Sequence, residues 1–542
     1  MADHLGSFCL VLHAHLPYVL HHGQYPHGEH WLYEAAAETY LPLLDLIGEV
    51  ALNQAHPGVT VGLTPVLLEQ LSHPTFKEGF GRYLSERIEW ARRDQAAFRR
   101  DGQAHMAHLA DRWAEWYAHW ADVFERVDRD IPRAFAARAG EGHIEILTSN
   151  ATHGYMPLLL EDAGVRAQVR AGVATSERIL GFKPTGMWLP ECAYRPAGPW
   201  YPPVVYGDRR DRWGVDGIVA AEGITHFFVE GRMLDAQYCN PLLPLGVLGP
   251  YGDLTCHAFG RHAQVCERVW SGSIGYPAAG EYLEFHKKHN GSEHAPGLRY
   301  WKVTRSQSGL GEKDLYYPDD VPPALHRHVR HFCGAIREAL ARYRRYSDSP
   351  AVVTATFDAE LFGHWWFEGP RFLRDVILEL NADPAVDVVT SAEYLDRHKP
   401  QHSIHLREGS WGDGGDHRVW LNDKTYWIWE MEYRAEARFG RLTFELPWET
   451  HAEIRRVLEL AGRELLLLQA SDWPFVIYTQ GAVDYGIQRF CAHASRFEHM
   501  CDVAEKCAAG EQPLDDFDRL HIREIELCDS VFEHIDLSWW NA

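Results

Sequence analysis

The sequence has few positive charges and no long hydrophobic run. Lys and Arg number 53 against 76 Asp and Glu, which gives a formal net charge of −23. This balance argues against a nucleic-acid partner or an anionic membrane partner, because both need a surplus of cations on the protein. No run of about 18 apolar residues occurs, so we expect no membrane span. A neutral, polyhydroxylated substrate would not be repelled by the negative charge.

The sequence also lacks CxxC spacing, internal repeats and low-complexity tracts. Its 10 Cys are scattered, most of them in apolar contexts, and we expect reduced thiols in a cytoplasmic protein. The start, MADHLGSFCLVLHAHLPY, has no basic segment and does not resemble a secretory signal. Aromatic residues are abundant, with 20 Trp and 24 Tyr. Such rings fill cores, and they also pack against the apolar faces of sugars.

Seven short apolar runs predict buried parallel strands, and helical stretches separate most of them. The runs span residues 7–12, 59–63, 144–147, 185–189, 224–229, 351–357 and 386–390. This alternation predicts an α/β barrel or an open parallel sheet. Polar and aromatic residues follow the runs, as in HAHLPY, TSNATHGY, PECAY and DAELFGHWW. The carboxyl ends of barrel strands carry active sites, so the pattern predicts an enzyme.

Two insertions and a helical tail interrupt the alternation. Residues 76–140 show helical spacing, and we predict that their stripe of Trp residues is core. Residues 231–320 are rich in Gly, Pro, Tyr and His, and we expect a lid or substrate loop there. Strand signals fade after about residue 400. We therefore predict three domains, namely a catalytic domain (1–75 and 141–400), a helical insertion (76–140) and a mainly helical C-terminal domain (401–542).

Two acidic residues, Glu191 and Asp358, each follow an apolar run and have aromatic neighbours. Two carboxylates that face one pocket can act as nucleophile and general acid/base on a glycosidic bond. Apolar neighbours and mutual repulsion push their pKa values apart, so that one ionises while the other keeps its proton. The alternative is two ordinary acids paired with arginine, for which Arg195 is a candidate partner of Glu191.

The motif HAHLPY places His13 and His15 at a strand end, where alternate residues share one side. This spacing suits a zinc site, with Asp358 or His153 as a third ligand. It equally suits hydrogen bonds from the imidazoles to sugar hydroxyls. Both interpretations stay open on the residues alone.

A Gly- and Asp-rich segment, GSWGDGGDHRVWLNDKTYWIWE (409–430), contains several Trp residues. Trp411 and Trp420 lie in its glycine-rich part, and we predict that they are exposed platforms for sugar rings. Trp427 and Trp429 are predicted to be core. The segment SDWPFVIYTQGAVDYG (471–486) carries Asp472 between two helical stretches.

With these residues assembled, the chain resembles glycoside hydrolase family 57, and more narrowly that family's 1,4-α-glucan branching enzymes. The resemblance rests on HAHLPY, EILTSNATHGYMPLL, MWLPECAYRP, TFDAELFGHWWFEGP, the SWGDGGDHRVWLN loop and LLLLQASDWPF, which occur in family order. It implies a distorted (β/α)7 barrel with a helical insertion and a helical C-terminal domain that completes the cleft. It also implies a retaining mechanism on α-glucan, with no metal and no organic cofactor.

The resemblance assigns roles to individual residues. Glu191 matches the nucleophile and Asp358 the acid/base. The implied substrate-binding residues are Arg261, Ala278, Trp411, Asp472, His13, His15, His153, Trp270 and Trp420. Two departures stand out: the arginine segment reads FGRH where the family has FGRD, and the turn reads GYPAAG, so that Ala278 replaces a Gly.

The segment 231–260 matches the family only loosely, and it normally supplies a tyrosine over the cleft. Tyr238 and Tyr251 are present there. An altered loop would admit water and add hydrolysis to chain transfer. The alternatives are a 4-α-glucanotransferase or α-amylase of the same family, an HxH zinc hydrolase such as a deacetylase, and a non-catalytic glucan-binding protein. We expect a monomer or small homo-oligomer.

Overall fold

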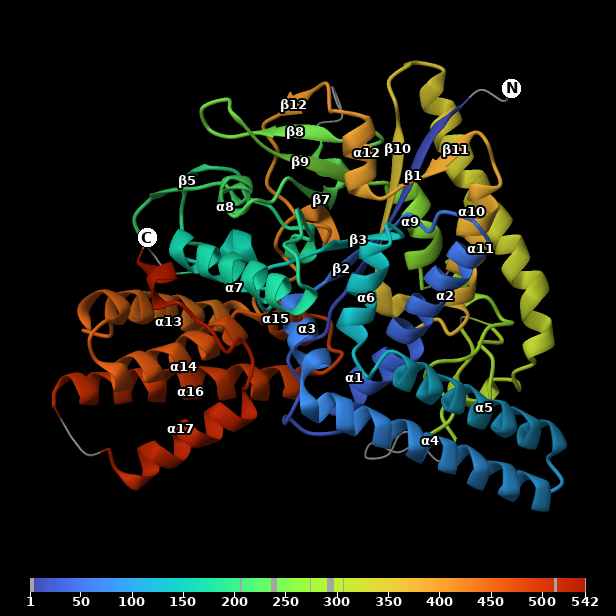
Figure 1. The fold of residues 1–542 in the computed structure, drawn as a ribbon, viewed down its shortest axis with the longest axis horizontal. Helices are drawn as coiled ribbons and strands as arrows, with labels where there is room; N and C mark the ends of the chain where they lie inside the picture. Colours follow the sequence, from blue (N-terminus) through green and yellow to red (C-terminus); the bar gives the residue numbers. More distant parts are fainter. Residues whose placement is uncertain are drawn as a thin grey trace.

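A ring of seven parallel strands forms the centre of the molecule (Figure 1). The computed structural model describes residues 4–204, 207–234, 241–272, 274–289, 297–305, 307–510 and 514–541, so Tyr238 lies outside the described residues. In ring order the strands are β1 (Gly6–Ala14), β2 (Val59–Leu63), β3 (Ile144–Leu147), β4 (Gly186–Met187), β7 (His226–Glu230), β9 (Leu254–Arg261) and β10 (Val352–Asp358). This arrangement confirms the predicted seven-stranded barrel.

The ring is distorted because two of its contacts are weak. β3 meets β4 only through a single bridge between Thr148 and Met187. β9 meets β10 only at Arg261 and Thr354. The other pairs have longer parallel registers, such as the seven residue pairs that join β1 to β10 from Ser7 to His13. All seven strands run the same way, so their carboxyl ends gather at one rim.

The seventh strand of the ring differs from the prediction. The run 386–390 forms β11 (Val386–Val388), which pairs outside the ring with the start of β1. Its place is taken by β9, whose sequence LTCHAFGR lies within the segment 231–320 predicted as a lid. That prediction was wrong for β9 and for β8 (Leu245–Leu248), which pairs antiparallel to it. β9 has polar and apolar residues mixed at its start, so no uninterrupted apolar run marks it.

The remaining strands lie at the edges. β12 (Ser403–Ile404) extends the sheet beside β8, and β5 (Gly198–Trp200) pairs with β6 (Arg210–Arg212) in a separate hairpin. Residues 403–404 were assigned to the C-terminal domain, but they return to the barrel sheet. The domain boundaries as such stay a prediction.

Helices cover the outside of the barrel or project from it. They are α1 (Glu29–Ala35), a π-helix (Ala36–Tyr40), α2 (Leu41–Leu52), α3 (Pro65–Ser72), α4 (Pro74–Arg100), α5 (Ala104–Arg126), α6 (Ile131–Gly140), α7 (Asp162–Leu180), α8 (Val215–Ala221), α9 (Ala263–Trp270), α10 (Val321–Arg344), α11 (Gly369–Asn381) and α12 (Ser391–Arg397). In the described part of the chain no helix is long and apolar enough to cross a membrane.

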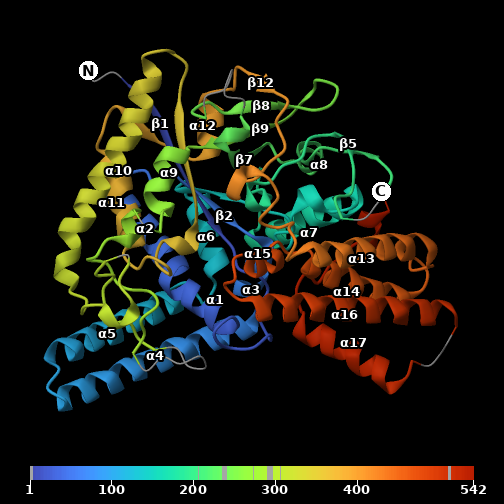
Figure 2. The ribbon, with the colours of Figure 1, turned by 180° about the vertical axis from the view of Figure 1, so that it is seen from behind.

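The C-terminal part is helical and lies beside the barrel (Figures 1 and 2). Its helices are α13 (Tyr426–Glu445), α14 (Ala452–Leu468), α15 (Asp472–Tyr478), α16 (Val483–Ala508) and α17 (Asp516–Cys528). α14 packs on α16, and the short α15 packs on α16 as well. This packing places the start of α15 next to the carboxyl ends of the barrel strands.

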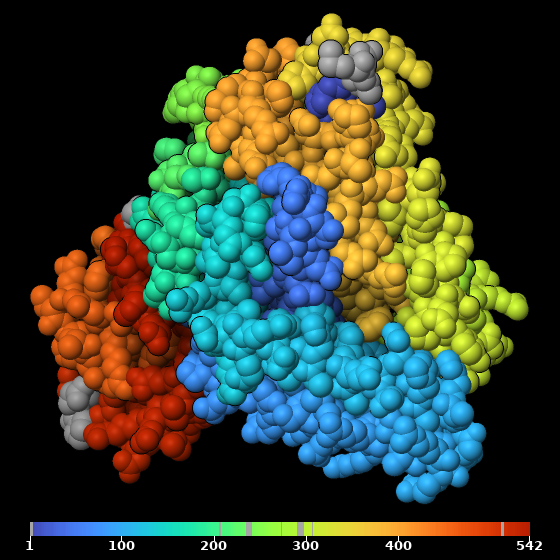
Figure 3. Space-filling view, turned by 45° about the vertical axis from the view of Figure 1, so that its right-hand side comes forward, coloured from blue at the N-terminus to red at the C-terminus, as the bar shows by residue number. Residues whose placement is uncertain are grey.

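The long helices α4 and α5 form a hairpin that projects from the barrel, away from the C-terminal helices (Figure 3). The predicted Trp stripe lies on α5, and Trp113, Trp120 and Phe124 are at most 7% exposed. The stripe is therefore core, as predicted. Trp116 is only partly buried and packs against Phe367 of the barrel side. α6 contacts β3, so it belongs to the barrel wall and not to the hairpin.

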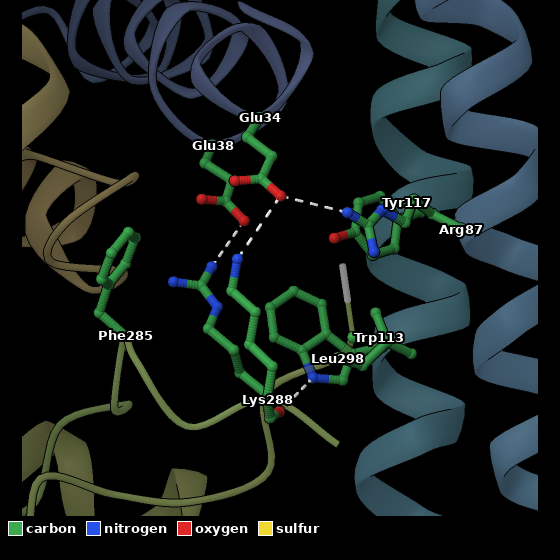
Figure 4. A pocket seen from close by; sticks show the side chains of 10 residues that line it. Glu34, Glu38, Arg87, Trp113, Tyr117, Phe285, Lys288 and Leu298 are labelled. Atoms are coloured by element: carbon green, nitrogen blue, oxygen red, sulfur yellow. Dashed lines mark hydrogen bonds and ion pairs between the residues drawn. The ribbon is translucent and has the colours of Figure 1, made fainter. Parts of the chain in front are cut away.

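Buried ion pairs join the hairpin, and the segments that carry Lys288 and Arg299, to the barrel (Figure 4). Glu34 of α1 pairs with Arg87 of α4 at 3.2 Å and with Lys288 at 3.6 Å. Glu38 of the π-helix pairs with Arg299 at 2.6 Å. The side chains of Glu38 and Arg299 are only 6% and 5% exposed, so each depends on the other for its charge compensation.

Replacing Glu38 by Ala is expected to lower the free energy of unfolding by about 3 to 5 kcal/mol, because Arg299 is left buried without its main counter-charge. Urea unfolding followed by circular dichroism measures the loss. The control is Glu89→Ala, which breaks an exposed pair with Arg93 on α4 and costs about 1 kcal/mol or less. Equal, small losses in both variants would contradict this account of the interface.

Candidate active site

Glu191 lies just beyond β4 in a strained turn. Its backbone has φ 61° and ψ 23°, and the next residue, Cys192, has φ 49°. A non-glycine residue in this left-handed region costs about 1 to 3 kcal/mol, and such strain concentrates at functional sites. The turn is held from outside, because the Trp411 amide donates to the Glu191 carbonyl at 3.1 Å and the Tyr194 amide to Gly409 at 2.9 Å.

The Glu191 carboxylate is oriented by two donors from the C-terminal part of the chain. Trp411 Nε1 donates to Oε2 at 2.8 Å, and Ser471 Oγ donates to Oε1 at 3.0 Å. The side chain is 13% exposed. Arg195, its candidate partner, instead lies 3.6 Å from Asp162. Within the described residues Glu191 has no arginine partner, so the interpretation as an ordinary Arg-paired acid is wrong.

Asp358 is the last residue of β10, and its carboxyl group lies close enough to Glu191 for the two negative charges to repel each other. In the part of the chain described here, no hydrogen bond or ion pair joins its carboxylate to another residue. Burial and the nearby acids Glu360 and Glu191 hold the pKa of Asp358 well above its usual range, although Arg261 opposes the shift. Its neutral form is therefore favoured, as a general acid requires.

Glu191 has a smaller shift. Burial raises the pKa of Glu191 to about 7, while the hydrogen bonds from Trp411 and Ser471 oppose the increase. The two donors stabilise the carboxylate form, and Asp358 has no comparable donors. The environments thus separate the two acids in the direction that assigns ionised nucleophile to Glu191 and protonated acid to Asp358.

A directional chain of hydrogen bonds ends on Glu191. His13 Nε2 lies 3.0 Å from His153 Nε2, and His153 Nδ1 lies 2.9 Å from Ser471 Oγ. The Ser471 hydroxyl donates its proton to Glu191, so its oxygen accepts from His153 Nδ1. His153 therefore carries its proton on Nδ1, and its Nε2 accepts a hydrogen bond from His13 Nε2. Burial lowers the pKa of His13 and of His153 well below the usual range, which keeps both rings neutral, as this series of hydrogen bonds requires.

His15 has a different partner from the other two histidines. Its Nε2 lies 3.0 Å from an oxygen of Asp472, at the start of α15, and its Nδ1 lies 3.1 Å from Thr64 Oγ1. Burial alone would lower the pKa of His15, but Asp472, together with Glu360 and Glu191, outweighs burial and the pKa is raised. The structure therefore brings His13, His15, His153 and Asp472 together around Glu191.

His15, His153 and Asp472 could also hold a metal ion, since their ligand atoms all lie within 4.8 Å of one another. Asp358, one of the two third ligands considered with the HxH motif, is not part of this set. To bind a metal, His153 would have to give up its hydrogen bond with His13 or with Ser471. The donor set is compatible with an ion, but His15 and Asp472 already bond each other, and both ring nitrogens of His153 already have partners.

A second set with metal-ligand spacing lies away from the active site and contains His22, His493 and Asp529. Arg489 donates to His493 Nε2 at 3.0 Å, and Arg496 pairs with Asp529 at 2.5 Å. A bound cation would face both guanidinium groups. This set is therefore a buried charge network that ties the loop after β1 to the C-terminal helices.

The predictions for the Trp residues have different outcomes. Trp411 is partly exposed, bonds Glu191, and meets Trp188 and Trp270 edge-to-face at 5.2 and 5.8 Å between ring centroids. Trp420 is 1% exposed and stacks on Tyr155 at 4.5 Å, inside a hydrophobic cluster. The prediction that Trp420 is an exposed platform was wrong, because its indole packs inward from the glycine-rich segment. Trp429 is core, as predicted.

Arg261 and Ala278 differ in their relation to the carboxylates. Arg261, at the end of β9, pairs with Glu230 of β7 at 2.8 Å and lies close enough to Asp358 to oppose its protonation. Ala278 ends a short 3-10 turn (Tyr276–Ala278) that packs beside α9, and nothing described joins it to Glu191 or Asp358. Its backbone φ is not positive, so the turn does not require Gly.

The departure at FGRH has a local explanation. His262 is the N-cap of α9, and its side chain accepts from the Val265 amide at 3.3 Å. An imidazole here performs the same capping task as an aspartate. The substitution is thus a change of helix cap, outside the group of side chains around Glu191.

Three residues of the site were missed by the sequence reasoning. Ser471 bonds Glu191, Glu360 accepts from Tyr40 Oη at 2.6 Å and from the His15 amide at 3.0 Å, and Glu230 pairs with Arg261. Glu230 directly follows the run 224–229, and Glu360 follows Asp358 by two positions, so the strand-end rule could have found both. Nothing in the local sequence marks Ser471.

Comparisons with known proteins show the family of the chain. The chain matches the family model described as glycosyl hydrolase family 57 over residues 9–307, and the model described as 1,4-alpha-glucan branching enzyme, C-terminal, over residues 432–540. A 1,4-alpha-glucan branching enzyme of Thermococcus kodakarensis is 35% identical over 541 residues, covering 98% of this chain and 78% of that protein.

Two solved structures show the range of similar proteins. A branching enzyme from Pyrococcus horikoshii superposes with a TM-score of 0.91 at 33% identity, covering 99% of this chain and 97% of that one. An α-amylase from Thermotoga maritima superposes with a TM-score of 0.83 at 28% identity, covering 99% of both chains. The family model, the full-length relative and the barrel lead to one assignment: the chain belongs to glycosyl hydrolase family 57.

Proposed function

We propose that the protein is a retaining 1,4-α-glucan branching enzyme whose nucleophile is Glu191 and whose acid/base is Asp358. The observation that carries the proposal is the contact between Ser471 and Glu191, at 3.0 Å. It couples the nucleophile to the C-terminal helices, the part of the chain that matches the branching-enzyme model. The substrate class is α-glucan, and family membership favours glycosidic chemistry over the zinc hydrolase.

In the first step Glu191 attacks the anomeric carbon of an α-1,4-linked glucosyl unit while Asp358 donates its proton to the departing O4. A covalent glycosyl-enzyme forms and the remainder of the chain leaves. The Trp411 and Ser471 donors hold the Glu191 carboxylate in place for attack. The neutral His13 and His153 keep Ser471 aligned without adding charge beside the nucleophile.

In the second step Asp358, now ionised, removes the proton from the 6-hydroxyl of an acceptor glucan, and this oxygen displaces Glu191. The product carries an α-1,6 branch with retained configuration. Water at the same position gives hydrolysis instead. The balance between the two outcomes depends on how well the acceptor excludes water from the carboxylates.

The proposal is tested on amylose by measuring new α-1,6 linkages by NMR beside new reducing ends by a copper-based assay. We expect new α-1,6 linkages to exceed new reducing ends. Reducing ends without new linkages would support an α-amylase, to which the Thermotoga maritima structure also points. Redistribution of α-1,4 chain lengths alone would indicate a 4-α-glucanotransferase, and glucan binding without either product would indicate a non-catalytic protein.

The Ser471 contact gives a pH prediction. Glu191 must be ionised to attack, so activity falls as the pH drops through its pKa, which burial raises to about 7. Replacing Ser471 by Ala removes a donor that stabilises the carboxylate, so the pKa of Glu191 rises further. The acidic limb of the kcat/KM profile is expected to move to higher pH, with the alkaline limb unchanged.

The control for this prediction is Ser85→Ala, which removes an exposed hydroxyl that donates to the Gly81 carbonyl on α4. Its profile should match that of the unmodified protein. A uniform loss of kcat in Ser471→Ala, without movement of the acidic limb, would contradict the electrostatic role of Ser471.

A further inference from the structure

A groove of about 370 Å³ lies next to Arg195, which is 3.6 Å from Asp162 of the groove lining. The start of α7 forms one wall, and β6 with Trp213 forms the other. α7, α8 and β5, the partner of β6, lie together at one side of the barrel in both ribbon views (Figures 1 and 2). The volume falls within the range of small-ligand sites.

Trp213 gives this groove an exposed aromatic surface. Trp213 is 62% exposed, whereas tryptophan residues are normally well buried. The Trp213 backbone amide donates to Asp162 Oδ2 at 3.0 Å, which fixes the main chain, and the ring lies close to Gly217 of α8. A positioned and exposed indole is a platform for the apolar face of a ligand.

The polar lining of the groove is balanced in charge. It consists of three arginines and three acids, namely Arg166, Arg210, Arg212, Glu161, Asp162 and Asp211. Such a lining offers both donors and acceptors, which matches sugar hydroxyls, since each donates one hydrogen bond and accepts others. A phosphate or carboxylate ligand would meet as many negative as positive groups, so the balance favours a neutral ligand.

Arg212 is a rigid member of the groove lining. Its side chain is 3% exposed, its Nε donates to Asp162 at 2.7 Å, and its Nη1 donates to the Leu159 and Leu160 carbonyls at 2.9 Å each. Its Nη2, which is buried, has no hydrogen-bond partner among the described residues. The guanidinium also lies over the Trp200 ring, 4.8 Å from its centroid, so Arg212 is held in a fixed position beside the groove.

The groove is linked to the active-site loop. The Val215 amide donates to the Arg195 carbonyl at 3.0 Å, and Arg195 lies 3.6 Å from Asp162, which also holds Trp213. Arg195 follows Glu191 by four residues. A chain bound on Trp213 would therefore be held against the same loop that positions the nucleophile.

We propose that this groove, defined by Trp213, Arg212 and Asp162, is a second α-glucan-binding site that holds a segment of a long chain outside the catalytic centre. The ligand class, α-glucan, follows from the proposed function, so the proposal rests on that function. It predicts that the site contributes to polymer affinity and does not contribute to turnover of chains too short to reach it. The bond-breaking step at Glu191 is unaffected.

The test compares Trp213→Ala with the unmodified full-length protein in two assays. Affinity electrophoresis in gels that contain glycogen measures polymer binding, and steady-state kinetics with maltoheptaose measures turnover of a short chain. We expect Trp213→Ala to weaken retention by glycogen about tenfold, which corresponds to about 1.4 kcal/mol, with kcat on maltoheptaose unchanged. Trp213→Phe is expected to recover part of the affinity, because it restores an aromatic face.

Tyr346→Ala is the matched control, because Tyr346 is 85% exposed beyond α10 and does not line the groove. Glycogen retention by Trp213→Ala equal to that of this control would overturn the proposal and leave the proposed function intact. Displacement from glycogen by inorganic phosphate but not by maltoheptaose would overturn it as well. Trp213-dependent glycogen binding by a protein that forms no new linkage would support the site while refuting the branching activity.

Discussion

Replacing Glu191 by Gln is expected to lower kcat on amylose by a factor on the order of 10⁴ or more. The amide is similar in shape to the carboxylate, but its single oxygen can accept from only one of the two donors, Trp411 and Ser471, and it cannot attack the anomeric carbon. Stability should change little, because the buried position loses a negative charge that no arginine compensates. The rate of new reducing ends plus new α-1,6 linkages measures the effect.

The control for this substitution is Glu89→Gln on the exposed face of α4, whose activity should equal that of the unmodified protein. Retention of near-normal amylose turnover by Glu191→Gln would show that another group attacks. In that case the strained turn at Glu191 would have only a structural role.

Replacing Asp358 by Asn is expected to lower kcat on amylose by about 10²- to 10⁴-fold, because the departing O4 no longer receives a proton. A substrate whose leaving group needs no proton should behave differently. With α-maltosyl fluoride, the first step should proceed at a rate close to that of the unmodified protein, and the glycosyl-enzyme should then accumulate for lack of a base. Release of fluoride in a single turnover, measured with an ion-selective electrode, follows this step.

The contrast between the two variants separates their roles. Glu191→Gln should release no burst of fluoride, whereas Asp358→Asn should release about one equivalent per enzyme. A burst from Glu191→Gln and none from Asp358→Asn would reverse the assignment. An equal loss of the first step in both variants would show that Asp358 does more than transfer a proton.

The local sequence predicted the strands that are continuous apolar runs, but it did not predict β9, which is not a continuous apolar run. β1, β2 and β10 are buried along most of their length, so their residues are visibly hydrophobic. β9 begins with exposed and half-buried residues, and its pairing with β7 over five residues is a long-range property. The run 386–390 is mostly apolar apart from Asp387 and Thr390, but it pairs outside the ring, and composition does not show whether such a run lies inside or outside the ring.

Active-site residues at the ends of strands were predictable from the sequence. Residues that a distant segment of the chain contributes were less predictable. Glu191 and Asp358 follow barrel strands, and the barrel rule places both at one rim. Ser471 reaches Glu191 across 280 sequence positions through the packing of α15, which no short motif encodes. The orientation of Trp420 is also a packing result: the same glycine-rich segment that leaves Trp411 beside the carboxylates buries Trp420 against Tyr155.

The most direct test of the central claim is peptide mass spectrometry of Asp358→Asn after brief reaction with α-maltosyl fluoride. The account predicts one maltosyl unit attached to Glu191, in the peptide that contains WLPECAYR. Attachment to a different residue, or a fluoride burst without any covalent adduct, would contradict the assignment of Glu191 as the nucleophile of a retaining enzyme.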